Sequence, residues 1–318
     1  MPLHSFNHAA MAAEFRITIA GSDYPYARDA ARAAFAELDR IEGLLSRFHP
    51  TSDVARINSL PTGGSVRVSP DTFRCLSEAF RVKALTGGAF DVTAGLNGTR
   101  RGRLALLRTG LRIRAVRPGA RVDLGGIGKG YALDRMAALL REWGIDSAML
   151  SGGGSTVLAL DPEPGKAGWT VGIRNPGIRG ERSSRGQQGW PDTSLAGVRE
   201  LGKVMLCRTA FSGSGTAENG AHLLDPATSL PARGPAAAWV LAPSGAESDA
   251  LSTAFMIMTA ARAKKLVARR KDVSAIIAVS ASGGFRLQCT GPKRAAGFTI
   301  SLRDKKRARR PSKAPGRR

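Results

Sequence analysis

The chain is short of the residues that build disulfide frameworks and zinc sites. Its 318 residues include 3 cysteines, Cys75, Cys207 and Cys289. They are far apart and odd in number, and none belongs to a CxxC pair. This excludes a closed disulfide framework and a cysteine-based zinc or redox motif. We interpret the three thiols as buried or inert.

Long apolar runs are absent as well. No stretch approaches the roughly 18 consecutive apolar residues that indicate a transmembrane helix. Ahead of the first strand-like segment, the N-terminal sequence has neither a basic region nor an apolar one, so it does not resemble a secretory leader. We therefore expect no membrane span and a cytoplasmic location.

Acidic residues are few: 25 Asp and Glu stand against 48 Lys and Arg, a net charge of +23. Residues 303–318 hold nine of the basic residues and one acidic residue, Asp304. We predict a disordered basic tail over 303–318, after a single domain over 1–302. The tail could bind nucleic acid. Alternatively, the high arginine content could reflect the amino-acid usage of the whole proteome, with no partner behind it. Basic helical motifs with interleaved aromatics are absent, so a nucleic-acid partner is not expected.

The apolar pattern predicts an α+β fold, with mixed sheets packed against helices, because strands and helices do not alternate strictly. Ser69 is the expected N-cap of a helix that starts at residue 70, and Gly87 and Gly88 are expected to end that helix. The predicted helices cover residues 23–48, 70–86, 128–143 and 247–270. The predicted strands cover 15–20, 112–116, 121–124, 147–150, 156–160, 169–174, 197–199, 204–209, 236–242, 275–280 and 284–288. An exposed loop is expected over 177–193.

The segment from Arg121 to Asp134, RVDLGGIGKGYALD, carries the clearest chemical signal. A glycine-rich turn leads into a helix, whose N-terminus presents unpaired N–H groups and a partial positive charge, and Lys129 adds a cation. The spacing fits neither the Walker P-loop nor the GxGxxG dinucleotide fingerprint. The segment indicates a phosphate or pyrophosphate site, or only a tight turn with a solvated lysine.

Asp249 and Thr253 are four residues apart, so their oxygens share one helix face. Such oxygens suit Mg²⁺, which takes further ligands from substrate phosphates. Alternatively, Asp249 caps the helix and Thr253 only packs. Two weaker signals are residues 87–91, which could hold a planar ring or end a helix, and His222, which could be a general base or a structural histidine.

Together and in this order, the segments resemble the FAD:protein FMN transferases, the ApbE family. The family carries GG-x-FD, DLGGIAKGYA-x-D, H-x-[IL]-DP-x-T and DALAT motifs, among others. The resemblance spans residues 11–290. The matching positions here are Met11, Ser46–Pro50, Arg56–Asn58, Gly87–Asp91, Asp123–Asp134, Gly152–Gly154, Trp169–Pro176, Phe211–Gly213, His222–Thr228 and Asp249–Thr253.

The resemblance implies a two-lobed catalytic unit that splits FAD, attaches FMN through a phosphoester to a Thr or Ser of a target protein, and releases AMP. Mg²⁺ would be held by the Gly126 carbonyl, Asp249 and Thr253, and His222 would be the base. Such chemistry depends on positioning and charge neutralisation more than on covalent catalysis. The implied FAD contacts are Met11, Phe48, Ala89, Phe90, Asp91, Asp123, Lys129 and Leu223.

The chain departs from the family pattern, which bears on acceptor recognition more than on flavin binding. Only 31 residues lie between Asp91 and Asp123, a short interval for the family. The substituted positions are Ala12 and Ala13 for Gly-Thr, Phe48 for Tyr, Gly128 for Ala, and Ser229 for Gly. No D-x-x-[ST]-G-A-[ST] acceptor site is present, so the acceptor must be another protein. Two alternatives stay open: a flavin-binding or FAD-hydrolysing relative without acceptor transfer, and a nucleic-acid-associated protein.

Overall fold

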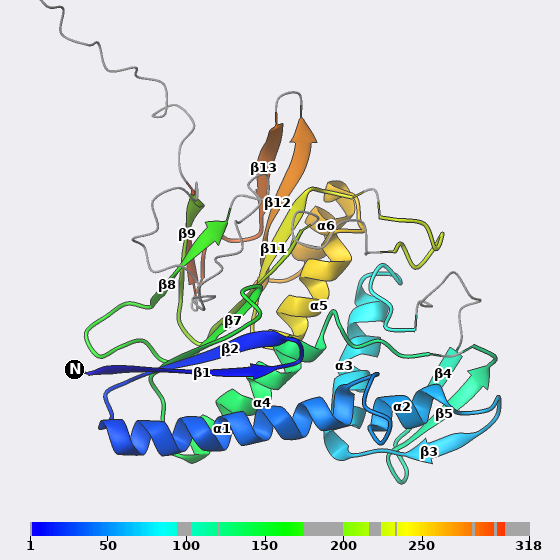
Figure 1. Ribbon diagram of the computed structural model, residues 1–318. Coiled ribbons are helices and arrows are strands. Elements are labelled where there is room, and N and C mark those ends of the chain that lie inside the picture. The colour runs from blue at the N-terminus through cyan, green and yellow to red at the C-terminus, as the bar shows by residue number, and fades with distance from the viewer. Residues whose placement is uncertain are drawn as a thin grey trace, which may run out of the picture.

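The computed structural model describes residues 2–93, 103–119, 121–174, 200–215, 224–232, 234–281, 284–295 and 298–302. Three sheets and six helices make up this part of the chain (Figure 1). In it, no helix is both long and apolar enough to cross a bilayer.

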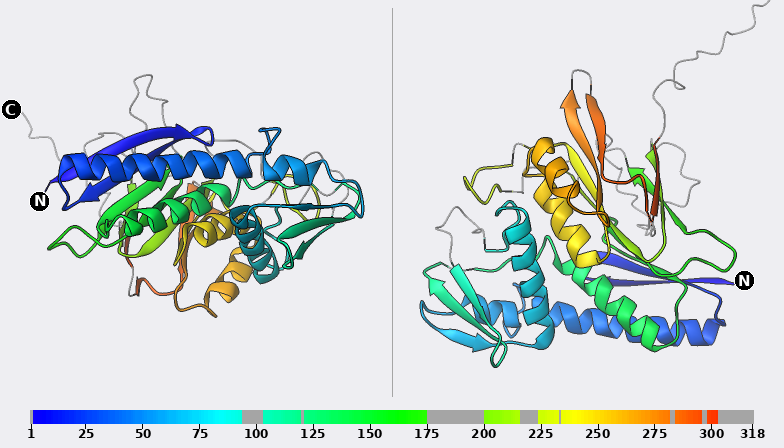
Figure 2. Two further views of the ribbon diagram at one scale, coloured as in Figure 1. Left: turned by 90° about the horizontal axis from the view of Figure 1, so that it is seen from below. Right: turned by 180° about the vertical axis from the view of Figure 1, so that it is seen from behind.

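The largest sheet has eight antiparallel strands in the order β1-β2-β6-β7-β10-β11-β12-β13. Its strands are β1 (Leu3–Ala10), β2 (Ala13–Ala20), β6 (Ala148–Gly152), β7 (Thr156–Ala159), β10 (Thr209–Gly215), β11 (Ala237–Ala242), β12 (Ser274–Ala281) and β13 (Gly284–Thr290). One face is covered by helices α1 (Tyr24–Leu45), α4 (Gly128–Glu142), α5 (Gly245–Phe255) and α6 (Ala260–Val267) (Figure 2). The other face is covered by a four-stranded sheet of β8 (Trp169–Arg174), β9 (Glu200–Leu206), β14 (Arg294–Ala295) and β15 (Phe298–Leu302).

The central strands are apolar on both faces because both faces are covered. In β11, alternate residues enter different cores: Ala238 and Val240 join the core under the helices, and Trp239 and Leu241 join the core against the four-stranded sheet. Since side chains of a strand alternate between faces, the sequence AAWVLA fills both layers, and all six residues are buried.

A smaller lobe lies at one end of α1. It consists of α2 (Asp53–Asn58), α3 (Pro70–Leu85) and a three-stranded sheet in the order β3-β5-β4, formed by β3 (Ser65–Arg67), β4 (Arg103–Leu107) and β5 (Arg112–Arg117). The inward side chains of this sheet belong to the same apolar core as the face of the large sheet that the helices cover. The two lobes therefore share one core.

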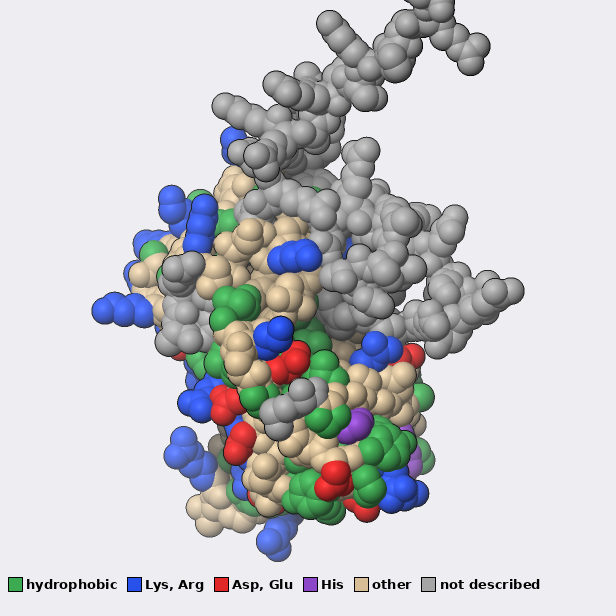
Figure 3. Space-filling view, turned by 90° about the vertical axis from the view of Figure 1, so that its left-hand side faces the viewer, with side chains coloured by type: hydrophobic (Ala, Val, Ile, Leu, Met, Phe, Trp, Pro, Cys, Tyr) green, Lys and Arg blue, Asp and Glu red, His purple; other side chains and the backbone are tan. Residues whose placement is uncertain are grey.

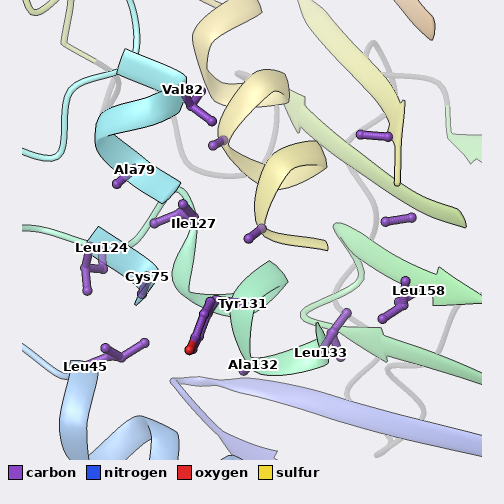
Figure 4. Close-up of a cluster of buried hydrophobic side chains, with 14 of the residues drawn as sticks. Leu45, Cys75, Ala79, Val82, Leu124, Ile127, Tyr131, Ala132, Leu133 and Leu158 are labelled. Atoms are coloured by element: carbon purple, nitrogen blue, oxygen red, sulfur yellow. The ribbon is translucent and has the colours of Figure 1, made fainter. Parts of the chain in front are cut away.

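That shared core surrounds the segment between β5 and α4. Figure 4 shows Leu45 of α1, Cys75 and Val82 of α3, Leu124 and Ile127 of the turn, Leu133 of α4 and Leu158 of β7 in one cluster. A fully buried Leu or Ile contributes roughly 1.5–3 kcal/mol. Leu124 and Ile127 thus anchor the glycine-rich turn in the core, while Gly125 between them is exposed.

Several predicted elements are confirmed: α1, α3 with Ser69 Oγ accepting the Thr72 N–H at 3.1 Å, α4, and β8 at the predicted residues. The fold class, α+β with antiparallel sheets and helices, is also confirmed. The predicted loop at 177–193, the predicted strand at 197–199 and the tail at 303–318 lie outside the described residues.

Two predicted elements were wrong, and other elements, β1 among them, were not predicted. Residues 121–124 form no strand, because Val122 pairs with the Asn58 side chain through both its N–H (2.6 Å) and its carbonyl (3.0 Å). The helix predicted over 247–270 is two helices, and Thr259 between them caps α6 by accepting the Arg262 N–H. The edge strand β1 was not predicted, since its alternation is carried by weakly apolar residues.

Candidate active site at the crossing of α4 and α5

Helices α4 and α5 cross with backbone against backbone. A Cβ added at Gly130 would lie 2.0 Å from the Gly245 carbonyl oxygen, and one added at Gly245 would lie 2.4 Å from the Gly130 carbonyl oxygen. Distances below 3.0 Å cannot be accommodated without a shift of backbone. The helices can approach this closely only because both residues at the crossing are glycines. The close approach brings the first turn of α4 next to the first turn of α5.

Each helix supplies a carboxylate that caps the other. Asp249 Oδ2 of α5 accepts the Gly130 N–H at 3.2 Å, at an end of α4 where no side chain of its own forms a cap. Asp134 of α4 accepts the N–H groups of Gly245 and Ala246 at 2.7 and 2.9 Å. Both carboxylates thus satisfy N–H groups that a helix N-terminus leaves unpaired.

Burial raises the pKa of Asp134 to about 6, against the opposing effect of its hydrogen bonds from Ala246 and Gly245. The carboxyl is partly removed from water, which disfavours its charged form. Asp134 lies in the family-like motif, but no role was predicted for it.

Helix α5 is also held from its other side. Glu247 is 4% exposed and forms ion pairs with Arg81 of α3 at 2.6 Å and with Arg270 at 2.8 Å. Burial favours the neutral acid, but hydrogen bonds from Arg270 and Arg81 outweigh it and hold the pKa of Glu247 below its usual range. This network fixes the first turn of α5 two residues before Asp249.

Asp249 keeps acceptor capacity despite its burial. The residue is 4% exposed, yet among the described residues its carboxylate meets only the Gly130 N–H and the Lys129 ammonium, whose Nζ lies 4.0 Å from Oδ2. A buried carboxylate normally has more partners than this. The free capacity suits a cation.

Thr253 presents its hydroxyl to the glycine-rich turn. A Cβ added at Gly126 would lie 3.1 Å from Thr253 Oγ1, so the two residues are in close contact. The neighbouring hydroxyls of Ser248 and Ser252 bond to carbonyls of their own helix. The Thr253 hydroxyl makes no hydrogen bond to any described residue, and it is therefore available to a ligand.

The predicted metal residues Gly126, Asp249 and Thr253 thus come together and offer carbonyl, carboxylate and hydroxyl oxygens. Hard oxygens of this kind fit Mg²⁺. In the described part of the chain, no group of three His, Cys, Asp or Glu side chains could hold a metal ion. An ion bound at this place would therefore need further ligands from water or from substrate phosphates.

The predicted flavin-binding segment 87–91 reaches the same turn. The Phe90 ring lies 3.2 Å from a Cβ added at Gly126, and Ala89 and Phe90 are 7% and 4% exposed. Asp91 is fixed by Lys83 Nζ at 2.6 Å and by the hydroxyl of Thr93 at 2.7 Å. The segment forms one wall of the candidate site.

Asp123 and Phe48 lie at a second wall. Asp123 Oδ1 accepts the Gly125 N–H at 2.9 Å and so orders the turn. Its Oδ2 lies 3.6 Å from Arg47 Nε, and the Arg47 guanidinium stacks on the Phe48 ring at 4.3 Å. Phe48 is 80% exposed, so one aromatic face is open to a ligand. The sequence interpretation had assigned no role to Arg47.

Lys129 lies between two turns of the large sheet. A Cβ added at Gly153, in the β6–β7 turn, would lie 3.3 Å from both Lys129 Cδ and Ala13 Cβ. Met11 precedes Ala13 in the β1–β2 turn, where its N–H donates to Glu42 Oε1 at 2.8 Å. The candidate base His222 and the predicted flavin contact Leu223 lie outside the described residues.

Comparison with known proteins gives a consistent result. The ApbE family model matches residues 11–277. The FAD:protein FMN transferase of Salmonella typhimurium is 26% identical over 301 residues, which cover 86% of this chain and 83% of the relative. The FAD:protein FMN transferase of Treponema pallidum is 25% identical and covers 72% of this chain and 71% of its own.

Solved structures show the same fold. The flavinyl transferase ApbE of Pseudomonas stutzeri, in its apo form, superposes with a TM-score of 0.75 at 23% identity, covering 91% of this chain and 94% of its own. The ApbE protein of Thermotoga maritima gives a TM-score of 0.73 at 24% identity, with 91% and 97% covered.

Proposed function

The chain belongs to the ApbE family, and on that premise we propose that it transfers FMN from FAD to a Thr or Ser hydroxyl of an acceptor protein. The reaction is Mg²⁺-dependent and releases AMP. The observation that carries this proposal is the meeting of Asp249 and Thr253 with the turn around Gly126. A phosphate turn beside oxygen ligands with free acceptor capacity is the arrangement that a bound diphosphate and cation require.

In the proposed reaction the acceptor oxygen attacks the phosphorus on the FMN side of the diphosphate. A new phosphoester P–O bond forms, and the P–O bond to the bridging oxygen breaks, so AMP leaves with that oxygen and its electron pair. The hydroxyl proton passes to a base, for which His222 is the candidate. Mg²⁺, when bound, would neutralise charge on the phosphates.

The chain's own groups position the diphosphate. The N-terminus of α4 attracts negative charge, and Lys129 adds a cation 4.0 Å from Asp249. Asp123 keeps the turn in shape by accepting the Gly125 N–H. The open face of the Phe48 ring is suited to stacking on the flavin. The proposed flavin contacts remain Met11, Phe48, Ala89, Phe90, Asp91, Asp123, Lys129 and Leu223.

The test is an incubation of the protein with FAD, Mg²⁺ and a target domain that bears a flavinylation site. Transfer adds the mass of FMN to the target and releases an equal amount of AMP. Free FMN and AMP without labelled target would instead make the protein a FAD pyrophosphatase. Omission of Mg²⁺ should abolish the reaction, and full activity in a chelator would contradict the metal assignment.

Thr253 allows a finer test. Thr253→Val removes the hydroxyl with little change of shape, and we expect transfer to slow about tenfold or more and to require more Mg²⁺. Thr253→Ser keeps the hydroxyl and should retain most activity. Equal activity of the two variants would remove Thr253 from the metal site.

The cytoplasmic location stays a prediction.

A further inference from the structure

We propose that the outer face of the β3-β5-β4 sheet docks the acceptor protein through an acidic surface next to its flavinylated Thr or Ser. This proposal rests on the transferase function and names the chemistry of its partner. It starts from the charge of one segment. The 31 residues between Asp91 and Asp123 contain eight Arg and neither Asp nor Glu.

The described arginines of this sheet are exposed, and their positions place like charges together. In the antiparallel register, Arg67 of β3 stands opposite Arg112 of β5, and Arg103 of β4 stands opposite Arg117 of β5. All four are exposed. Like charges directly opposite one another weaken a sheet, so the arrangement is unfavourable for folding alone.

These four arginines form no ion pair with any described residue. Arg112 donates to Ser65 Oγ at 3.0 Å and to the Ser65 carbonyl at 3.1 Å, both uncharged. Some arginines in other parts of the fold are paired: Arg40 binds Glu37 and Asp71, and Arg81 binds Glu78 and Glu247. The strands of this sheet contain no acidic residue, so their guanidinium groups remain available to carboxylates of a partner.

The sheet is held close to the site. Asp123 N donates to the Val92 carbonyl at 2.9 Å, which joins the chain before β4 to the chain after β5. Arg117 ends β5 only six positions before Asp123, so the two lie within roughly 20 Å of each other. A protein interface covers about 800 Å² per partner. An acceptor that brings its hydroxyl to the site would therefore also reach this sheet.

A protein partner fits this face better than a nucleic acid does. The strands read SVR, RLALL and RIRAVR and contain no aromatic residue on which bases could stack. Guanidinium groups form two-pronged hydrogen bonds with carboxylates, and exposed charge pairs mainly accelerate and orient association. The face is thus suited to guiding an acidic surface toward the site.

The test uses Arg67→Glu/Arg117→Glu. Each new carboxylate stands opposite an arginine, so the sheet should fold at least as well as before. The control is Arg32→Glu/Lys166→Glu, which makes the same charge change on exposed residues of α1 and of the turn after β7. That turn lies on the left-hand side in Figure 1, away from the three-stranded sheet. On that left-hand face, basic side chains are mixed with acidic ones (Figure 3).

The probes are two peptides with the same D-x-x-T-G-A-T acceptor sequence, one flanked by glutamates and the other by glutamines. We expect the unmodified protein to show a KM at least about tenfold lower for the glutamate peptide at low salt, and this preference to disappear near 0.5 M salt. Arg67→Glu/Arg117→Glu should abolish the preference, with kcat and FAD affinity unchanged, and the control should keep it.

The proposal is overturned if the unmodified protein does not prefer the glutamate peptide. It is equally overturned if Arg67→Glu/Arg117→Glu and the control variant lose this preference to the same extent. It is also overturned if a fluorescent duplex DNA binds in place of the peptide and only the sheet variant releases it. If no peptide is labelled and FAD is not split, the transferase function itself has failed. That result is distinct, because FAD cleavage does not require the sheet.

Discussion

Two carboxylates do the same structural work on the two sides of the α4–α5 crossing, but their surroundings differ. Asp134 accepts two N–H groups from α5 and is partly buried. Asp249 accepts one N–H group from α4 and faces Lys129 at a distance. The Asp134 side is complete within the protein, and the Asp249 side keeps acceptor capacity for the proposed ligand.

The two carboxylates therefore have different roles: Asp134 holds the helices together, and Asp249 is available to bind the proposed ligand. A carboxylate that is fully paired contributes only to structure, whereas one with capacity left over is available for chemistry. The geometry of the second depends on the first, because Asp134 fixes the register of α5 that brings Asp249 and Thr253 to the turn.

The most damaging change should be Gly130→Ala, which disrupts the contacts of both Asp134 and Asp249 at the α4–α5 crossing. The new methyl group would overlap the Gly245 carbonyl, so the helices must separate. We expect a loss of at least about 3 kcal/mol in the free energy of unfolding, together with loss of FAD binding. Denaturant titration and flavin fluorescence would measure the two effects.

Gly128→Ala is the matched control in the same turn. A Cβ there would meet the Leu124 Cβ at 3.9 Å, an ordinary contact. Its stability should be unchanged or higher by up to about 1 kcal/mol. Equal stability of the two variants would mean that the close approach of the helices is not required.

Asp249→Asn should affect activity far more than folding. The amide oxygen can still accept the Gly130 N–H, but the negative charge is lost. We expect transfer to fall at least about 100-fold and stability to change by less than about 1 kcal/mol. Initial rates over a Mg²⁺ series, with thermal unfolding in parallel, would show whether the two roles separate as expected.

The last effect concerns pH and Asp134. Its pKa of about 6 lies above the ordinary value of 3.8, so the folded protein holds this proton more tightly than the unfolded chain. The associated stability is fully present below about pH 4 and is lost as pH rises to about 6, by about 3 kcal/mol at most. Asp134→Asn should flatten this slope in denaturant titrations at pH 4 to 7. An identical slope in both proteins would show that Asp134 is not responsible.

Much of the candidate site could be proposed from the sequence because its residues lie in short, contiguous motifs. The turn at 123–130 and the pair Asp249 and Thr253 were identified from local chemistry, and family resemblance gave them a common purpose. The contacts of Asp134 with Gly245 could not be predicted. They join residues more than 100 positions apart, and no local pattern marks a glycine that another helix approaches.

Other errors have similar causes. The strand predicted over 121–124 failed because the Asn58 side chain took the hydrogen bonds that a neighbouring strand would otherwise form. The helix predicted over 247–270 failed because Thr259 competes for the backbone and starts a second helix, although the apolar spacing continues. In both cases a single polar side chain overrode the apolar pattern.

The hydrogen bond between Asp123 N and the Val92 carbonyl has a consequence for how the enzyme can change. It clamps the chain at the points where it leaves the site and returns to it. Because the entropic cost of closing a loop grows slowly with its length, the residues between these points can be lengthened, shortened or replaced while the catalytic centre stays intact. If the proposed docking of the acceptor holds, exchange of these residues between relatives would change which acceptors the enzyme uses.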